Sequence, residues 1–408
     1  MAMRDILERQ ANSIEYVLHT HGIDAEVDSG KLSARLAHFH VVLRPGVRHA
    51  QLAPYMPELA DALGVTACRL SSREDGAYLE VPRPDPVPVR LLPLVQRVSD
   101  VVPPITATLG LDGEGTPLLL RLNSPDVDPV VISGERGAGK SSLLRSMALS
   151  LALHNSPDSM RLLLLDCTGQ GATFRGMEGL PHLACPIANG PVDSLVSLRW
   201  ALRALSRRVH TSTDDELRFD DDLDGDDAPF ERVMPSIEPS LVIMVDGADE
   251  LCSTGNRRAD AETIQAMNKL LAEGSRHDIH IVVSAERPDQ IAGVSARWGA
   301  RIAGRVASAE VARLALGMKG SGAQGLLGGG DFLISLNAEL IRFQAGAVSQ
   351  AELQKAVDLI VSCAQVYTRQ PQEDEEIPEF PNRRDNRNRG PITRSGEPTH
   401  LRRVWNGE

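Results

Sequence analysis

The sequence predicts an α/β protein: a doubly wound parallel sheet, preceded by a small α+β domain and followed by a disordered tail. Three observations predict this class. From about residue 96 short apolar runs alternate with helical segments, the segment before them mixes a helix with alternating stretches, and the last segment is polar. Strand–helix alternation is typical of doubly wound folds, and polar segments are typical of disorder. We therefore expect a small domain over 1–95, a sheet domain over 96–366 and a tail over 367–408.

The small domain is expected to start with a helix over residues 4–21, where apolar side chains recur at helical spacing up to Gly22. Two stretches in which apolar and polar residues alternate predict strands, and a short helix is expected between them. The strands cover 38–43 and 77–81, and the short helix covers 57–63. A proline-rich connector then closes the domain.

The sheet domain contains continuous apolar runs that predict buried parallel strands. These runs cover residues 129–132, 162–165, 241–245 and 279–283. Continuous rather than alternating hydrophobicity suits strands that helices cover on both faces.

A glycine-rich turn follows the first of these runs and opens a helix over 142–153. Its sequence, GERGAGKS at 134–141, fits the pattern G-x-x-x-x-G-K-[ST]. Backbone N–H groups in such a turn surround a phosphate, and the helix N-terminus adds a positive field. Lys140 would reach the β- and γ-phosphates, and the Ser141 hydroxyl would hold Mg²⁺. The sequence therefore predicts a site for ATP and Mg²⁺, with a purely structural glycine turn as the alternative. The residues expected to bind the nucleotide are Gly134, Arg136, Gly137, Ala138, Gly139, Lys140, Ser141 and Ser142.

The apolar run 241–245 ends in Asp246, which is suited to hold the magnesium-bound water. An ordinary aspartate at a strand end is the alternative. Ser141 and Asp246 are thus the expected metal ligands. Lys140 and Asp246 are expected at adjoining strand tips of one sheet, where they would hold the two ends of one magnesium–triphosphate complex.

Composition limits the class of protein further. The 408 residues suffice for two domains, and contents of 42% hydrophobic and 24% charged residues are ordinary for a soluble protein. No apolar run approaches the roughly 18 to 20 residues of a membrane span, and charges interrupt the start where a secretory signal needs an apolar core. We therefore expect a cytoplasmic protein, and its five separated cysteines are expected to be reduced thiols.

The net charge of −12 excludes a protein whose whole surface binds nucleic acid, so any contact with a polyanion must be local. Much of the acidity lies in residues 214–227, which we interpret as a solvated loop. Scattered arginines in the tail could bind polyanions or a protein partner, or could simply keep the tail soluble. Loops after the strand that ends at Asp166, including Arg175, are candidate DNA contacts.

Six further stretches stand before and after the phosphate loop, in the order 105–117 (ITATLGLDGEGTP), 165–166 (LD), 178–183 (EGLPHL), 198–208 (LRWALRALSRR), 279–288 (IHIVVSAERP) and 325–333 (GLLGGGDFL). In this order, and together with the phosphate loop, they resemble the FtsK/SpoIIIE DNA translocases of the HerA–FtsK superfamily. The resemblance extends over most of residues 5–350, and the first unit looks like the small α domain that precedes the family's motor.

The resemblance implies a RecA-like P-loop NTPase that assembles into a hexameric ring and moves double-stranded DNA through its channel. No membrane-spanning N-terminus is recognisable, so a soluble form is expected. No C-terminal winged helix is recognisable either, so the resemblance does not extend to sequence-directed loading.

The resemblance also shows departures in the catalytic residues. Gly247 stands where the family has the glutamate that prepares the attacking water, and such a group contributes roughly 10²–10⁴ in rate. Asp249 and Glu250 are the local substitutes. If the segment after the strand is helical, Glu250 lies one turn beyond Asp246 on the same side; otherwise it is a helix-start carboxylate stabilised by the dipole.

Two further departures concern Glu286 and Arg276. Glu286 replaces the family's strand-end glutamine and is either a displaced catalytic base or a sign of lost activity. Ring ATPases use an arginine from the neighbouring subunit. The family's position holds Ser275 here, with Arg276 one place later, and a one-residue shift rotates a helical side chain by about 100°. Arg276 is the first candidate for this role, Arg301 the second, and a plain surface arginine is the alternative.

Three hypotheses follow. The first is an ATP-driven DNA translocase. The second is a nucleotide-binding ring or partner-recruiting module with little hydrolysis, in which a Gly247→Glu variant would recover activity. The third is a protein-translocating ATPase like the FtsK-related engines of type VII secretion, because Val245-Asp-Gly resembles their less active modules.

Overall fold

The computed structural model describes residues 2–44, 47–48, 51–73, 76–98, 102–168, 171–217, 238–291, 293–294 and 297–369. The chain divides into one compact unit, Met1–Gln365, and a second unit, Val366–Glu408. The predicted tail lies outside the described residues apart from its first three, and so does most of the acidic segment 214–227. In the part of the chain that the structure describes, no helix has the length and apolar character needed to cross a membrane.

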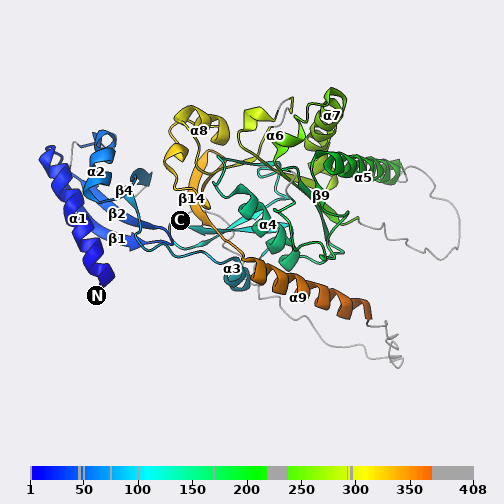
Figure 1. Cartoon of the computed structure of the whole chain (residues 1–408), viewed down its shortest axis with the longest axis horizontal. Helices are drawn as coiled ribbons and strands as arrows, with labels where there is room; N and C mark the ends of the chain where they lie inside the picture. The colour runs from blue at the N-terminus through cyan, green and yellow to red at the C-terminus, as the bar shows by residue number, and fades with distance from the viewer. Residues whose placement is uncertain are drawn as a thin grey trace, which may run out of the picture. The chain divides into compact units, whose positions relative to one another are not determined.

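The small domain is a four-stranded antiparallel sheet of order β1-β2-β4-β3, with α1 packed on it (Figure 1). Its core contains Ile14 and Leu18 of α1, together with Phe39 and Leu79 of the sheet. The predicted helix and strands are confirmed, but the sequence did not predict β1, because most of its side chains are exposed and give no apolar signal. The elements are α1 (Ala2–Thr20), β1 (Ala25–Leu32), β2 (Leu36–Leu43), α2 (Met56–Ala62), β3 (Arg69–Arg73) and β4 (Gly76–Pro82).

The large sheet has ten strands in the order β6-β5-β14-β13-β12-β7-β11-β10-β8-β9. From β12 to β9 all neighbouring strands are parallel, which confirms the four predicted strands. The parallel strands are β7 (Val130–Ser133), β8 (Met160–Asp166), β9 (Ala188–Asn189), β10 (Ser240–Asp246), β11 (Ile279–Ala285) and β12 (Ala300–Ala303).

The other four strands of the sheet pair in antiparallel fashion, and they were not among the strands that the apolar runs predicted. These strands come in hairpins, and the turn of the second hairpin has positive φ angles at Asn337 and Ala338. Such short hairpin turns carry weak sequence signals when neither turn residue is glycine. The strands are β5 (Thr106–Asp112), β6 (Pro117–Arg121), β13 (Asp331–Leu336) and β14 (Glu339–Ala345).

Helices cover both faces of the large sheet, as the doubly wound prediction requires. One apolar core joins Ile132 and Leu164 to side chains of α4 and α9, and the other joins Val131 and Leu163 to side chains of α5 and α7. Alternate residues of each strand therefore face opposite cores. The helices are α3 (Leu91–Val98), α4 (Lys140–His154), α5 (Pro191–Leu217), α6 (Ala248–Leu251), α7 (Arg257–Glu273), α8 (Ala309–Leu316) and α9 (Gln350–Arg369). The predicted domain boundary at 95–96 falls within α3 and stays a prediction.

A buried ionic cluster joins the small sheet to the large one. Arg342 of β14 donates to both carboxylate oxygens of Asp331, at 2.9 and 2.6 Å, and also to Glu80 of β4. Glu80 and Asp331 are each only 3% exposed. Burial alone would raise the pKa of Glu80, but the charges of Arg342 and Arg69 hold it below the ordinary value of 4.5.

Replacing Glu80 with glutamine is expected to lower the free energy of unfolding at pH 7 by about 3 kcal/mol, because Arg342 loses a buried partner. A carboxylate whose pKa is lowered by folding stabilises the protein above its unfolded pKa, and this contribution disappears as the pH falls through the folded pKa. The difference between variant and wild type should therefore shrink on acidification. Urea unfolding at pH 7 and pH 4 measures both effects. Glu8→Gln, on the exposed surface, is the control, and equal losses in the two variants would contradict the prediction.

Candidate nucleotide site

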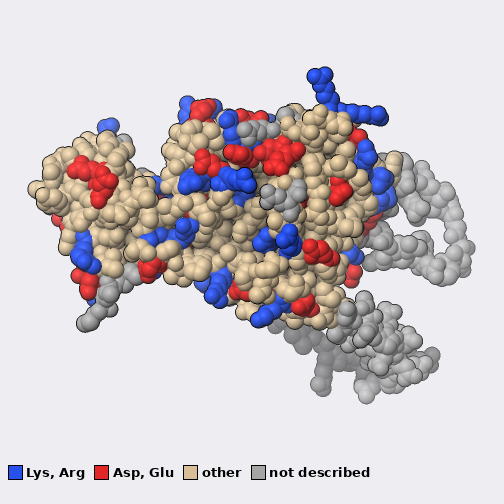
Figure 2. All heavy atoms as spheres, in the orientation of Figure 1, with Lys and Arg blue, Asp and Glu red and all other residues tan. Residues whose placement is uncertain are grey.

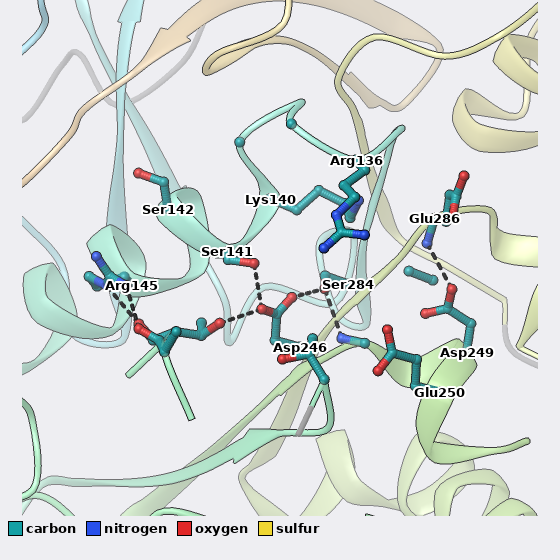
Figure 3. Close-up of a pocket in the computed structure, with 17 residues that line it drawn as sticks. Arg136, Lys140, Ser141, Ser142, Arg145, Asp246, Asp249, Glu250, Ser284 and Glu286 are labelled. Carbon is teal, nitrogen blue, oxygen red and sulfur yellow. Dashed lines mark hydrogen bonds between the residues drawn. The ribbon is translucent and has the colours of Figure 1, made fainter. Parts of the chain in front are cut away.

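A cavity of about 570 Å³ lies at the carboxyl ends of β7, β10 and β11 (Figure 3). This is the edge of a parallel sheet where ligands bind in α/β folds. The loop over residues 134–141 forms one wall, and its last two residues are the first two of α4, which begins at Lys140. Asp246, Asp249, Glu250 and Glu286 form the opposite side.

The phosphate loop leaves no room for a larger residue at Gly139. This glycine caps α4 with a φ of 107°, and a Cβ atom there would lie 2.8 Å from the backbone nitrogen of Gly330. The loop is therefore pressed against another backbone segment at Gly139, a close approach that glycine permits.

The Lys140 side chain folds over the phosphate loop. Its Nζ donates to the carbonyl oxygens of Gly134, at 2.6 Å, and Glu135, at 3.2 Å. Burial lowers the pKa of Lys140, while nearby carboxylates, led by Asp246 and Asp249, oppose that shift. A polyphosphate would supply further negative charge and would favour the charged form of the ammonium group.

Asp246 is 2% exposed and accepts three hydroxyl hydrogen bonds. The donors are Ser141 Oγ at 2.5 Å, Thr173 Oγ1 at 2.6 Å, and Ser284 Oγ. The structure thus brings the two predicted metal ligands together. The prediction of adjoining strand tips is wrong, because β11 lies between β7 and β10 and contributes Ser284 to the site.

The donor atoms fit a magnesium ion. A hydroxyl and a carboxylate oxygen are hard ligands, and both belong to rigid elements, the start of α4 and the end of β10. Mg²⁺ would be held by Ser141 and Asp246, and when bound it would neutralise charge that develops on the phosphates.

Several residues of the site were not predicted. Asp166, fully buried at the end of β8, accepts from Thr168 Oγ1 at 2.5 Å and from the backbone N–H of Thr173 at 3.0 Å. Arg145 of α4 donates to the carbonyls of Ala172 and Thr173, both at 2.6 Å. Asp166 and Arg145 together hold the segment at residues 172–173, which forms the wall of the cavity beside Asp246. For Asp166 the sequence did contain a signal, because two successive predicted strands are each followed directly by an aspartate. In the structure these two residues, Asp166 and Asp246, are partners in the pairing of β8 with β10.

Gly247 has φ 79° and ψ 50°, a left-handed conformation that favours glycine. A Cβ atom there would lie 3.2 Å from Thr168 Cγ2. The backbone at this position therefore disfavours a glutamate. The recovery of activity that the second hypothesis expects for a Gly247→Glu variant is opposed by this strain.

The segment after Gly247 is helical, which is the condition under which Glu250 was expected one turn beyond Asp246, and Asp249 and Glu250 of α6 line the cavity. Figure 3 shows these two carboxylates side by side, across the site from Arg145. Burial raises the pKa of Glu250, and the charges of Asp249, Asp246 and Asp166 raise it further, while Arg136 opposes them. A raised pKa makes the carboxylate a stronger base, which suits proton abstraction from water.

Glu286 lies at the cavity, directly after β11. Its carbonyl oxygen accepts from Gly134 N–H at 3.1 Å, and its N–H donates to Asp249 at 3.3 Å. The main chain of Glu286 thus joins the phosphate loop to α6. The adjacent Arg287 pairs with Asp289 at 2.6 Å and does not line the cavity.

The candidate arginines are not at the cavity of their own chain. Arg276 lies in the short helix before β11, about 20 Å from the cavity edge, because seven strand residues rise about 3.3 Å each. Arg301 of β12 donates to the Leu314 carbonyl at 3.4 Å, and burial lowers its pKa. Arg175 lines a second cavity with Phe174 and other residues. Within its own chain, Arg276 is therefore too far from the cavity to reach a nucleotide there.

The fold and the site define a P-loop ATPase domain: the serine at the end of a glycine-rich loop donates to a strand-end aspartate. Residues 95–290 match the FtsK/SpoIIIE family. The chain carries an FtsK/SpoIIIE-family ATPase domain.

Comparisons with known proteins support this assignment. The DNA translocase FtsK of Leptospira interrogans is 26% identical over 362 residues, which cover 86% of this chain and 37% of that protein. The chain spans less than half of the curated relatives' length. Among solved structures, the cytoplasmic domain of the type VII secretion ATPase EccC of Thermomonospora curvata is 25% identical, with a TM-score of 0.50 over 63% of this chain and 31% of that one. The pCW3 conjugation coupling protein TcpA, in its monomer form with ATPγS, shares the fold at 15% identity and a TM-score of 0.54, covering 86% of this chain and 99% of that one.

Proposed function

We propose that this chain is an ATP-dependent double-stranded DNA translocase that works as a homo-oligomeric, hexameric ring in the cytoplasm. One observation carries the proposal: Ser141 Oγ lies 2.5 Å from the Asp246 carboxylate, beside the phosphate loop. The curated relatives named DNA translocase FtsK match over most of the chain, which supports DNA as the polymer.

Each residue has a defined task in this proposal. The loop over 134–141 binds the phosphates through its N–H groups, and Lys140 turns from the loop carbonyls to the β- and γ-phosphates. Asp246 orients the ligands of the metal. Glu250 takes the proton of the attacking water in place of the missing glutamate at 247, and Arg276 of one subunit reaches the nucleotide of the next.

DNA would contact the ring locally. Figure 2 shows acidic atoms gathered over α6, beside the cavity, and elsewhere on this face lysine and arginine are interspersed with acidic residues. A mixed surface attracts DNA only at selected loops, and phosphate contacts weaken as salt rises. Arg175, in the loops after β8, is the first candidate contact, and the arginines of the tail are candidate contacts with DNA or a protein partner.

The proposal predicts ATP hydrolysis that linear duplex DNA stimulates. The DNA concentration for half-maximal stimulation should rise at least about tenfold between 50 and 200 mM salt, because several phosphate contacts release counterions. Turnover is measured with and without duplex across the salt series, with Lys140→Ala as the inactive control. Hydrolysis that DNA leaves unchanged at every salt concentration would contradict the proposal.

Two alternatives to the DNA translocase are each supported by a specific observation. Gly247 and Glu286 favour a nucleotide-binding ring with little hydrolysis, and absence of turnover with intact ATP binding would favour it over the translocase. The likeness to the EccC cytoplasmic domain favours a protein-translocating ATPase. Turnover stimulated by a peptide and indifferent to DNA would support that alternative.

A further inference from the structure

A run of three glycines, residues 328–330, lies against the phosphate loop. The N–H of Gly329 donates to the carbonyl of Gly137 at 3.2 Å, and the N–H of Gly330 donates to the carbonyl of Ala138 at 2.8 Å. All three glycines of this run have positive φ angles. The run therefore holds two successive peptide groups of the phosphate loop from outside.

These two bonds set the direction of N–H groups in the phosphate loop. A trans peptide group is planar, so its C=O and N–H point in opposite directions. When Gly330 holds the carbonyl of Ala138, the N–H of Gly139 must point away from the glycine run. Gly139 lines the cavity, so this orientation serves phosphate binding.

The other side of the glycine run contacts the small domain. Arg35, in the turn between β1 and β2, donates through Nη1 to the carbonyl of Gly328 at 2.8 Å and to that of Gly329 at 3.0 Å. These carbonyls belong to the same two peptide groups whose N–H groups, on Gly329 and Gly330, bind the phosphate loop. Each of these peptide groups thus accepts a hydrogen bond from the Arg35 guanidinium through its carbonyl and donates one to the phosphate loop through its N–H. Hydrogen bonds in such a chain polarise and strengthen one another.

Further contacts fix the glycine run. Gln344 Nε2 donates to the Gly329 carbonyl at 3.2 Å. Asp331, the next residue, is bound by Arg342 of the buried cluster described above, and it accepts from Leu327 N–H at 2.8 Å. The run is thus held at its end by residues of the large sheet and at its centre by Arg35.

We propose that Arg35 is a positioning residue for the phosphate loop, acting from the small domain through the peptide groups of Gly328, Gly329 and Gly330. The small domain then sets how well the loop is organised for a triphosphate before it binds. This inference rests on the proposed function, because it assumes that the loop binds ATP. Its structural part concerns the nucleotide-free protein and is testable separately.

Two measurements on the full chain test the inference. In Arg35→Ala, amide hydrogen exchange of the segment around 328–330 should accelerate about tenfold without nucleotide, because a charge-assisted hydrogen bond is lost. The Kd for a fluorescent ATP analogue should rise about three- to tenfold, since a smaller fraction of the protein has a competent loop. Arg35→Lys should keep both the exchange rate and the Kd close to the wild-type values, because an ammonium group also donates to carbonyls.

Arg44→Ala is the matched control. Arg44 also lies in the small domain, but it pairs with Asp24 and Glu26 there, at 3.2 and 3.5 Å. Its replacement by alanine removes the same positive charge as Arg35→Ala does. Unchanged exchange in Arg35→Ala, or equal changes in Arg44→Ala, would overturn the inference. Faster exchange with an unchanged Kd would overturn the positioning role. If the wild-type chain bound no ATP, the proposed function would fail, while the exchange measurement would still decide whether Arg35 holds the glycine run.

Discussion

Replacement of Lys140 by alanine is expected to lower ATP hydrolysis by about 10²–10³-fold, because it removes a donor aimed at charge that develops on the phosphates. Nζ already lies 2.6 Å from the Gly134 carbonyl, inside the loop that would surround the triphosphate. A short rotation of the side chain exchanges a neutral carbonyl for phosphate oxygens, and charge-assisted hydrogen bonds are the stronger ones. Turnover at saturating ATP and the Kd of a fluorescent analogue measure the effect on both chemistry and binding.

Lys319→Ala is a suitable control for the Lys140 variant. Lys319 is exposed after α8 and does not line the cavity, so its loss changes the net charge equally and should leave turnover unchanged. Turnover of Lys140→Ala within threefold of wild type would show that Lys140 is not the cation that stabilises the phosphates in the reaction. Arg136 and Arg145, which also line the cavity, would then be the cations to test.

The sequence predicted those features that depend on local signals. The parallel strands β7, β8, β10 and β11 were predicted because strands buried on both faces are continuously apolar, and the phosphate loop because glycine, lysine and serine have fixed spacing there. Ser141 and Asp246 were named from their places at a helix start and a strand end. The fold then brings them to 2.5 Å across 105 positions of the chain.

The rest of the site depends on contacts that no local pattern encodes. Thr173 reaches Asp246 from a loop, and Arg145 reaches that loop from α4, although neither residue type is unusual at its position. The order of strands was also not predictable from their apolar character, so the position of β11 between β7 and β10, and with it the contribution of Ser284, was not predicted. The glycine run 328–330 was recognised as a motif, but its contact with the phosphate loop required the structure.

Glu250→Gln is expected to lower turnover by roughly 10²–10³-fold, because the amide cannot accept the proton of the attacking water. Glu250 lines the cavity four positions after Asp246, and burial together with neighbouring carboxylates raises its pKa. A general base acts only when deprotonated, so wild-type turnover should fall as the pH falls through this raised pKa. The residual turnover of the glutamine variant should lack that acid limb. A pH profile of kcat for both proteins measures it.

The same substitution should slightly raise the thermal stability of the nucleotide-free protein. A carboxyl group whose pKa is raised by folding destabilises the folded state once the pH exceeds its unfolded value, because ionisation is then easier in the unfolded chain. Glutamine removes that cost, so lower activity should accompany a higher melting temperature at pH 7. Glu286→Gln separates the two candidate bases: a large loss there, with Glu250→Gln near wild type, would assign the base to Glu286. Gly247→Glu is not expected to rescue Glu250→Gln, because a φ of 79° strains any side chain at that position.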